Sequence, residues 1–365
     1  MCRPRGRSVS GLLTIDGSQG EGGGQILRTS LSLAAIAGRP LRIENIRARR
    51  PKPGLAAQHL TAVRAVAALC RARLAGDEIG SGKLDFLPEA QVEAGDYAFD
   101  VAAVRRGGSA GATGLVLQAV LPPLALAAGR SRVSIRGGTH VAWSPPFDYL
   151  REVWLPALGA MGIAARLELR RSGWYPIGEG QIEAAVEGRT LAERPLRPVI
   201  LVERGRLLEV TGRAAAANLP VHIPRRMVER ATALLAEQGI QAGIEVEVLQ
   251  AACAGAGIFL TARYENLRCG FNALGTRGRP AEAVAEDAVT ALLAHERSGA
   301  ALDQYLADQV VLPLSLAAGP SRFTVERITG HLETNARVVE LFRAAEVGLE
   351  AAEGGSGLVT VTPAG

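Results

Sequence analysis

Three segments of the chain repeat one pattern of apolar and polar positions. They read LSLAAIAGRPLRI from Leu31, LALAAGRSRVSI from Leu124 and LSLAAGPSRFTV from Leu314. Each begins as the apolar end of a helix and continues, after a glycine, as a short strand of alternating apolar and polar residues. Because glycine ends many helices in a left-handed conformation, we predict that each helix stops at its glycine. These glycines are Gly38, Gly129 and Gly319.

A second amphipathic helix and further strands follow each of these segments. The predicted helices cover residues 55–70, 147–161 and 332–345. Two helices and several short strands per copy favour an α/β (α+β) fold in which both helices of a unit pack on one face of a sheet. We expect three such two-helix, four-strand units to form a large domain with pseudo-threefold symmetry.

Residues 190–277 do not follow the repeat. They contain the strand-like segments ILVERG, LLEVTG, IEVEVL and IFLTARYEN, and one helix predicted from about Ile223 to Gln238. We interpret this stretch as a smaller α/β domain inserted between the second and third copies. The large repeated domain is then discontinuous and consists of residues 1–189 and 278–365.

The composition indicates a globular protein. Of 365 residues, 48% are hydrophobic and 21% are charged, which excludes wholesale disorder. Aromatic residues make up only 4%, which argues against a single-strand binder built on stacking platforms. The four cysteines lack metal-ligand spacing, which indicates reduced thiols. The most apolar run, residues 114–129, falls short of the ~18 apolar residues of a membrane span. No targeting segment is visible, so we expect a cytoplasmic protein without a membrane partner.

The basic residues indicate an anionic partner. The formal net charge is +5, and Lys52 and Lys83 are the two lysines beside a large excess of arginines. Arginine suits bidentate phosphate recognition, although a genome rich in arginine codons would give the same composition. Arg47, Arg49 and Arg50 crowd a proline-stiffened loop with Lys52. A phosphate would offset their mutual repulsion; a solvated basic loop is the alternative.

A glycine-rich stretch, DGSQGEGGGQILRTS from Asp16, lies between a predicted strand and a predicted helix. In such loops backbone N–H groups can approach a phosphate, and the helix N-terminus favours negative charge. Glu21 offers a carboxylate that could hold a divalent metal. The stretch is neither a Walker loop nor a dinucleotide-binding motif, and a purely structural turn is the alternative.

Other polar residues interrupt apolar helices. Gln118 follows a second glycine-rich loop, residues 106–115, and Asp308 and Gln309 interrupt the predicted helix that begins near Tyr305. They either face water or read the hydroxyls or base of a nucleotide. His331 begins the last long helix. The positive end of a helix disfavours imidazolium, which would leave a neutral nitrogen able to attack phosphorus; a structural histidine is the alternative.

Five of these motifs occur in an order that resembles the RNA 3'-terminal phosphate cyclase family. They are DGSQGEGGGQILR, RPKPGLAAQHLTAV, GSAGATGLVLQAVLP, YLADQVVLPLSLA and GHLETN. The resemblance implies three similar α/β units plus a smaller inserted domain, as in enolpyruvyl transferases. Of this fold, only the three units are like those of enolpyruvyl transferases, and the smaller inserted α/β domain is additional. The resemblance also implies that ATP adenylylates a histidine, that AMP moves to an RNA 3'-phosphate, and that the 2'-hydroxyl then displaces AMP to leave a 2',3'-cyclic phosphate. A divalent metal, magnesium or manganese, is expected.

The resemblance assigns roles to individual residues. The catalytic residues would be His331, Glu21, Arg47 and Arg50, with Glu21 also the metal ligand. ATP contacts would come from Gln118, Pro145, Tyr305, Leu306, Ala307, Asp308 and Gln309. The RNA phosphate would lie near Gln25, Arg28, Gln58 and His59.

Some residues differ from the family pattern, and two other functions are compatible with the sequence. Ile177 and Glu179 stand in the GWYPIGEG segment where the family often has a basic or small residue and glycine, and His140 stands where relatives often have Asp or Asn. A non-catalytic ribosome-biogenesis member of the same family would lack the histidine at the helix start, which this chain retains as His331. An enolpyruvyl-type transferase would share the fold without a covalent nucleotide.

Overall fold

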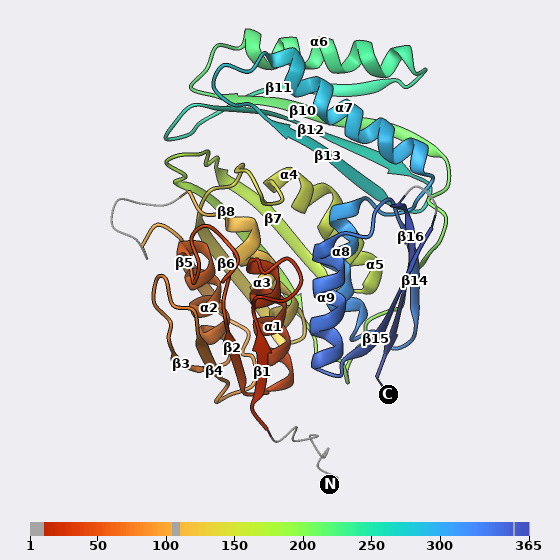
Figure 1. Cartoon of the computed structure of the whole chain (residues 1–365). Helices are drawn as coiled ribbons and strands as arrows, with labels where there is room; N and C mark the ends of the chain where they lie inside the picture. Colours follow the sequence, from red (N-terminus) through yellow and green to blue (C-terminus); the bar gives the residue numbers. More distant parts are fainter. Residues whose placement is uncertain (1–10, 104–109, 353–354, 365) are drawn as a thin grey trace.

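The computed structural model describes residues 11–103, 110–352 and 355–364 (Figure 1). The described chain forms four four-stranded sheets with helices packed against them, which confirms the α/β class. No helix of the described ranges is long and apolar enough to cross a membrane.

In the first unit two strands alternate with two helices, and two more strands follow. Its sheet has the order β1-β2-β4-β3, with β1 and β2 parallel and the other pairs antiparallel. Its elements are β1 (Leu13–Asp16), α1 (Gly24–Ala37), β2 (Leu41–Glu44), α2 (Ala57–Leu69), β3 (Arg73–Ala75) and β4 (Leu84–Leu87).

The second unit repeats this plan. Its sheet, β5-β6-β8-β7, again joins its first two strands in parallel and the others antiparallel. Its second helix is continuous over three segments, the middle one a π-helix, as predicted for residues 147–161. The elements are β5 (Asp96–Asp100), α3 (Thr113–Ala125), β6 (Gly129–Gly137), α4 (Phe147–Tyr149), the π-helix η1 (Leu150–Trp154), α5 (Leu155–Met161), β7 (Ala164–Arg171) and β8 (Gly180–Gly188).

The third unit has the same strand order, β9-β14-β16-β15, and the same pattern of directions. Figure 1 shows α8 and α9 side by side, with the sheet of β14, β15 and β16 next to them. Pseudo-threefold symmetry stays a prediction, and the common strand order supports it. The elements are β9 (Ile200–Leu201), α8 (Gln304–Leu314), β14 (Ser321–Val325), α9 (Gly330–Leu341), β15 (Ala345–Ala351) and β16 (Gly357–Pro363).

The smaller unit lies between β9 and α8 in the sequence. Its sheet has the order β11-β10-β12-β13, and Figure 1 shows α6 and α7 along the side that faces away from the other units. Buried residues of both helices share one hydrophobic core with this sheet. The elements are β10 (Leu207–Ala217), α6 (His222–Glu237), β11 (Ala242–Leu249), β12 (Gly255–Tyr264), β13 (Arg268–Leu274) and α7 (Ala281–Ser298).

These contacts bear on the domain boundaries. Because β9 pairs with β14, residues 200–201 lie in the third sheet, and α7 packs in the core of the smaller unit. In place of 190–277, we therefore propose that the inserted domain runs from about residue 203 to about residue 299. A separate core joins the three repeated units.

The predicted helix stops are correct once and wrong twice. Gly38 caps α1 in the left-handed conformation, with a φ of 60°. Helix α3 ends at Ala125 and α8 at Leu314, both before their glycines. Prolines lie in the last turns of these two helices, and a proline removes a backbone donor and clashes with the preceding turn.

Candidate active site

His331 and Glu21 meet at the start of helix α9. Nε2 of His331 lies 3.1 Å from Oε2 of Glu21. Thr329 caps this helix, because its hydroxyl oxygen accepts the backbone N–H of Leu332 at 3.2 Å. Nδ1 of His331 is buried and finds no hydrogen-bond partner within the described ranges. Nε2 is therefore the nitrogen that a ligand can reach.

The surroundings of His331 keep its ring uncharged. Burial lowers the pKa of His331 below its usual range, and the positive Arg28 and Arg50 lower it further, whereas Glu21 opposes them. A neutral imidazole retains a lone pair on one nitrogen at neutral pH. The site thus combines an uncharged imidazole with two nearby positive charges.

Glycines let the loop of residues 17–23 approach α9 closely. A Cβ on Gly20 would lie 2.2 Å from Oγ1 of Thr334, and Gly20 has a φ of +59°. A Cβ on Gly330 would lie 2.8 Å from Cγ of Glu21. The glycine-rich stretch therefore has a structural task, which is to bring the carboxylate of Glu21 against the helix that carries His331.

The basic loop contributes two arginines with different contacts. Nη2 of Arg50 lies 3.6 Å from Oε2 of Glu21 and donates to the Glu21 carbonyl at 3.2 Å. Arg47 instead donates to the carbonyl of Gly54 at 2.8 Å and so closes its own loop. Burial lowers the pKa of Arg47, and Arg50 acts in the same direction. Arg50 is the arginine of this loop that contacts the His331–Glu21 pair.

Gln58 and His59 lie in the first turn of α2. The backbone N–H of Ala56 donates to Nδ1 of His59 at 3.2 Å, so the neutral ring carries its proton on Nε2. Burial lowers the pKa of His59 to about 3, with help from the positive Arg28 and Arg47. The side-chain oxygen of Gln58 accepts the N–H of Ala112 at 3.2 Å and so joins the first unit to the second.

A buried hydrogen-bond network joins α1, α8 and α9 beside this pair. Arg28 donates to Oε1 of Gln25 at 2.5 Å. Asn335 accepts the hydroxyl of Thr29 at 2.6 Å and donates to the carbonyl of Asp308 at 2.6 Å. Sequence reasoning missed Thr29 and Asn335. The signal was the spacing, because Asn335 stands four residues after His331 and thus on the same side of the helix.

The carboxyl group of Asp308 faces a positive charge in this network. Burial raises the pKa of Asp308 to about 8, and Arg28 opposes the increase. Burial also lowers the pKa of Arg28 to about 10, so Arg28 remains charged at neutral pH. Nearby, Gln118 donates to Oε1 of Gln309 at 2.6 Å. A cavity of about 30 Å³ lies between these residues, which is the size of one water molecule.

Comparisons with known proteins decide the family. A sequence model described as RNA 3'-terminal phosphate cyclase matches residues 19–349. The chain is 63% identical to the RNA 3'-terminal phosphate cyclase of Methylococcus capsulatus, over 97% of this chain and 98% of that protein. The chain belongs to the RNA 3'-terminal phosphate cyclase family.

More distant relatives carry the same name. Identity is 50% to the RNA 3'-terminal phosphate cyclase of Nostoc punctiforme, over 94% of this chain and 97% of that protein. It is 41% to the one from Methanothermobacter thermautotrophicus, over 96% and 100%. Among solved structures, an enolpyruvyl transferase from Streptomyces tendae aligns with a TM-score of 0.26 and 14% identity, over 97% of this chain and 66% of that chain. That likeness is too weak to inform the fold.

The remaining residues that the cyclase family suggested lie in different surroundings. Tyr305 is 57% exposed, whereas Leu306 and Ala307 are buried in the core. Pro145, just before α4, lies against the first turn of α3, where a Cβ on Gly114 would lie 2.9 Å from the carbonyl oxygen of Pro145. Of the loop 106–115, residues 106–109 lie outside the described ranges.

The donor set around Glu21 fits a metal held together with phosphates. Within the described ranges, no three His, Cys, Asp or Glu side chains gather in a metal-binding cluster. Magnesium is commonly held by one or two carboxylates and by substrate phosphates. The single carboxylate of Glu21 matches that mode and does not match an all-protein cage.

Proposed function

We propose that this chain converts the 3'-terminal phosphate of RNA to a 2',3'-cyclic phosphate, using ATP and an adenylyl-histidine at His331. The observation that carries the proposal is the uncharged His331, with Nε2 accessible and Arg28 and Arg50 acting on it. Catalysis of phosphoryl and nucleotidyl transfer depends mainly on positioning and on charge stabilisation, and this site supplies both.

In the first step Nε2 of His331 attacks the α-phosphorus of ATP. A P–N bond forms, the P–O bond to the β-phosphate breaks, and pyrophosphate leaves. The reacting tautomer carries its ring proton on Nδ1, so that the lone pair of Nε2 forms the bond to phosphorus as Nε2 leaves its contact with Glu21. An uncharged ring is required, and the lowered pKa of His331 provides it.

Charged groups around the pair stabilise the phosphates. Arg28 and Arg50 offer guanidinium groups to the RNA phosphate, with Gln25, Gln58 and His59 beside them. Glu21 would hold a magnesium or manganese ion that neutralises the departing pyrophosphate. Arg47 acts through the loop that presents Arg50.

The nucleoside of ATP binds on the exposed side of α8. The ring of Tyr305 is available for stacking on adenine, with Pro145 on a neighbouring loop. The cavity between Gln118 and Gln309 is too small for adenosine, so the nucleoside would lie outside this cavity. Gln118, Gln309 and Asp308 would then contact the edge of the base and the hydroxyl groups of the ribose.

In the later steps AMP moves from Nε2 of His331 to an oxygen of the RNA 3'-phosphate. The vicinal 2'-hydroxyl then attacks that phosphorus, loses its proton and expels AMP, which leaves the cyclic phosphate. The retained His331 argues against the non-catalytic member, and we propose the cytoplasm as the place of action.

Labelled ATP tests the proposal. Incubation with α-labelled ATP and magnesium or manganese is expected to give an acid-labile protein–AMP adduct that survives denaturation, and His331→Ala is expected to abolish it. His222→Ala, at an exposed position on α6, is the matched control and is expected to label normally. An unlabelled wild-type protein, or equal labelling of His331→Ala, would exclude the mechanism.

A further inference from the structure

Two exposed aromatic side chains lie on neighbouring loops of the second unit. Trp143 is 98% exposed and Tyr175 is 77% exposed, and Ile177 beside Tyr175 is 43% exposed. The other two tryptophans, Trp154 and Trp174, are buried. The chain has few aromatic residues, and two of those that are exposed lie on these neighbouring loops. The low aromatic content alone argued against stacking platforms for a single strand.

The two loops are held together by defined contacts. The backbone N–H of His140 donates to the carbonyl of Gly173 at 3.0 Å, and a β-bridge joins His140 to Trp174. The rings of His140 and Trp174 stack with centroids 4.7 Å apart. Trp143 has a φ of 63°. The contacts of His140 with Gly173 and Trp174 hold the loop of Trp143 against the loop of Tyr175.

These loops adjoin the candidate active site through a short chain of contacts. Gln58, next to His59, accepts the N–H of Ala112, and Ala112 forms a β-bridge with Gly138. Gly138 begins the segment that leads to Trp143. A polymer whose end lies among Arg28, Arg50 and His59 would thus have the aromatic loops within the reach of its preceding residues.

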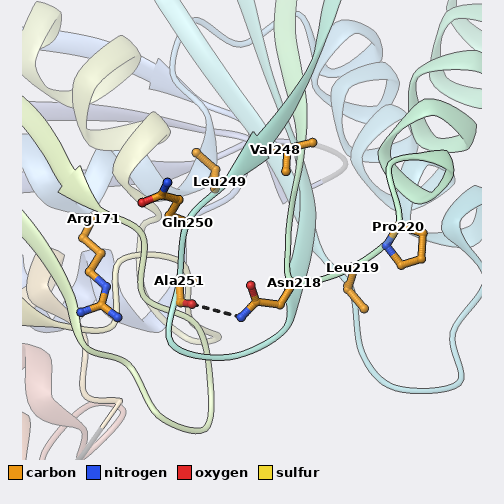
Figure 2. A pocket seen from close by; sticks show the side chains of 8 residues that line it. All are labelled: Arg171, Asn218, Leu219, Pro220, Val248, Leu249, Gln250 and Ala251. Carbon is orange, nitrogen blue, oxygen red and sulfur yellow. Dashed lines mark hydrogen bonds between the residues drawn. The ribbon is translucent and has the colours of Figure 1, made fainter.

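A groove with a positive charge lies beside the same loops. Figure 2 shows a cavity with Arg171 on one side and Asn218 on the other. Its volume is about 770 Å³, and Gln250 and Ala251 also line it. Nη2 of Arg171 lies 3.7 Å from Oε2 of Glu179, so a carboxylate partly offsets the positive charge. Exposed aromatic rings beside a groove that carries an arginine are features with which proteins bind single-stranded nucleic acid.

We propose that Trp143 and Tyr175 stack on bases of the RNA segment that precedes the 3'-terminal phosphate, and that Arg171 contacts its backbone. Glu179 weakens this binding because its carboxylate competes for Arg171. The inference deepens the proposed function, on which the identity of the RNA end rests. It predicts that affinity grows with RNA length beyond the terminal nucleotides.

Binding of two 3'-phosphorylated RNAs, a fluorescent decamer and a dinucleotide, tests the proposal. Trp143→Ala and Tyr175→Ala are each expected to weaken decamer binding about tenfold or more, as loss of a base–aromatic stack does. Turnover of the dinucleotide and formation of the protein–AMP adduct are expected to stay unchanged. Glu179→Gln is expected to tighten decamer binding a few-fold, and the effect should fade with added salt.

Leu208→Ala is the matched control, since Leu208 is 47% exposed at the far end of β10. Unchanged decamer binding in both aromatic variants would overturn the proposal, as would an equal loss for the dinucleotide. A change in the oligomeric state of Trp143→Ala without a change in RNA binding would assign the patch to a protein partner instead and also overturn it. If wild type forms no adduct yet the aromatic variants lose decamer affinity, the proposed function fails while this surface stands.

Discussion

Two histidine–carboxylate pairs in this molecule have the same distance between Nε2 and a carboxylate oxygen, but they differ in burial and in the groups around them. Nε2 of His331 lies 3.1 Å from Glu21, and Nε2 of His140 lies 3.1 Å from Asp148. The His331 side chain is 44% exposed, whereas the His140 side chain is fully buried. Among the residues that the structure describes, Nδ1 of His331 has no hydrogen-bond partner. The hydroxyl group of Thr139 contacts Nδ1 of His140 at 2.8 Å, so both nitrogens of that ring are occupied.

The second pair joins two units of the fold. Arg213, on strand β10 of the smaller unit, donates to both oxygens of Asp148 and to Glu247. Burial of Asp148 disfavours its charge, but hydrogen bonds with His140 and Arg213 hold its pKa below the usual range. The comparison teaches that the pair distance does not identify a catalytic histidine. Access to a ring nitrogen and unsatisfied bonding capacity distinguish His331 from His140.

The largest expected effect is a difference between the two pairs in how much each contributes to the free energy of unfolding. Asp148→Asn removes the charge that Arg213 pairs with in a buried place, which we expect to cost about 3–5 kcal/mol of the free energy of unfolding. Glu21→Gln alters a half-exposed pair and is expected to cost less than about 1 kcal/mol. Urea denaturation of both variants measures the difference. Equal costs would show that the two pairs have the same structural weight.

The next effect concerns the rate of adduct formation, in which Glu21→Gln is expected to be impaired more than Asp148→Asn. Glu21→Gln is expected to slow adduct formation from ATP about 10²-fold, because the carboxylate that contacts His331 and would hold the metal is lost. Asp148→Asn, assayed well below its unfolding midpoint, is expected to form the adduct at a rate within about threefold of wild type. Single-turnover labelling gives both rates. A normal rate in Glu21→Gln would remove Glu21 from the proposed chemistry.

A smaller effect divides ATP chemistry from RNA chemistry within the exposed pair. Arg50→Ala is expected to leave the adduct intact and to lower turnover of 3'-phosphorylated RNA about tenfold, since one charge-assisted phosphate contact is lost. Arg49→Ala is the matched control, because Arg49 is exposed on the same loop and is not among the residues that contact Glu21. Loss of the adduct in Arg50→Ala would contradict its assignment to the RNA.

Local patterns predicted those parts of the fold that depend on local chemistry. Helix α6 covers His222–Glu237, close to the predicted Ile223–Gln238, because its apolar spacing and Pro224 determine where it begins. Gly38 stops α1 as predicted. The predicted stops of α3 and α8 were wrong, because both helices end before their glycines.

Long-range contacts could not be read from the sequence in the same way. Asn335 bonds to Thr29 across 306 positions of the chain and holds α9 on α1. Arg213 meets Asp148 across 65 positions, in the buried junction of two units. Nothing in the neighbouring residues of either indicates a partner so distant. The motifs suggested where chemistry lies, whereas the network that fixes its geometry needed the folded chain.

The smallest expected effect concerns how His331 is held. Thr329→Ala removes the hydroxyl that accepts the N–H of Leu332, and loss of an N-cap costs about 1 kcal/mol. Adduct formation is expected to slow only a few-fold, because Asn335 and Thr334 still hold the same helix against α1 and the glycine-rich loop. Thr329→Ser keeps the hydroxyl and is expected to restore both stability and rate. If Thr329→Ala destabilised the protein without slowing the adduct, the cap would serve the fold alone, and the orientation of His331 would depend on Asn335.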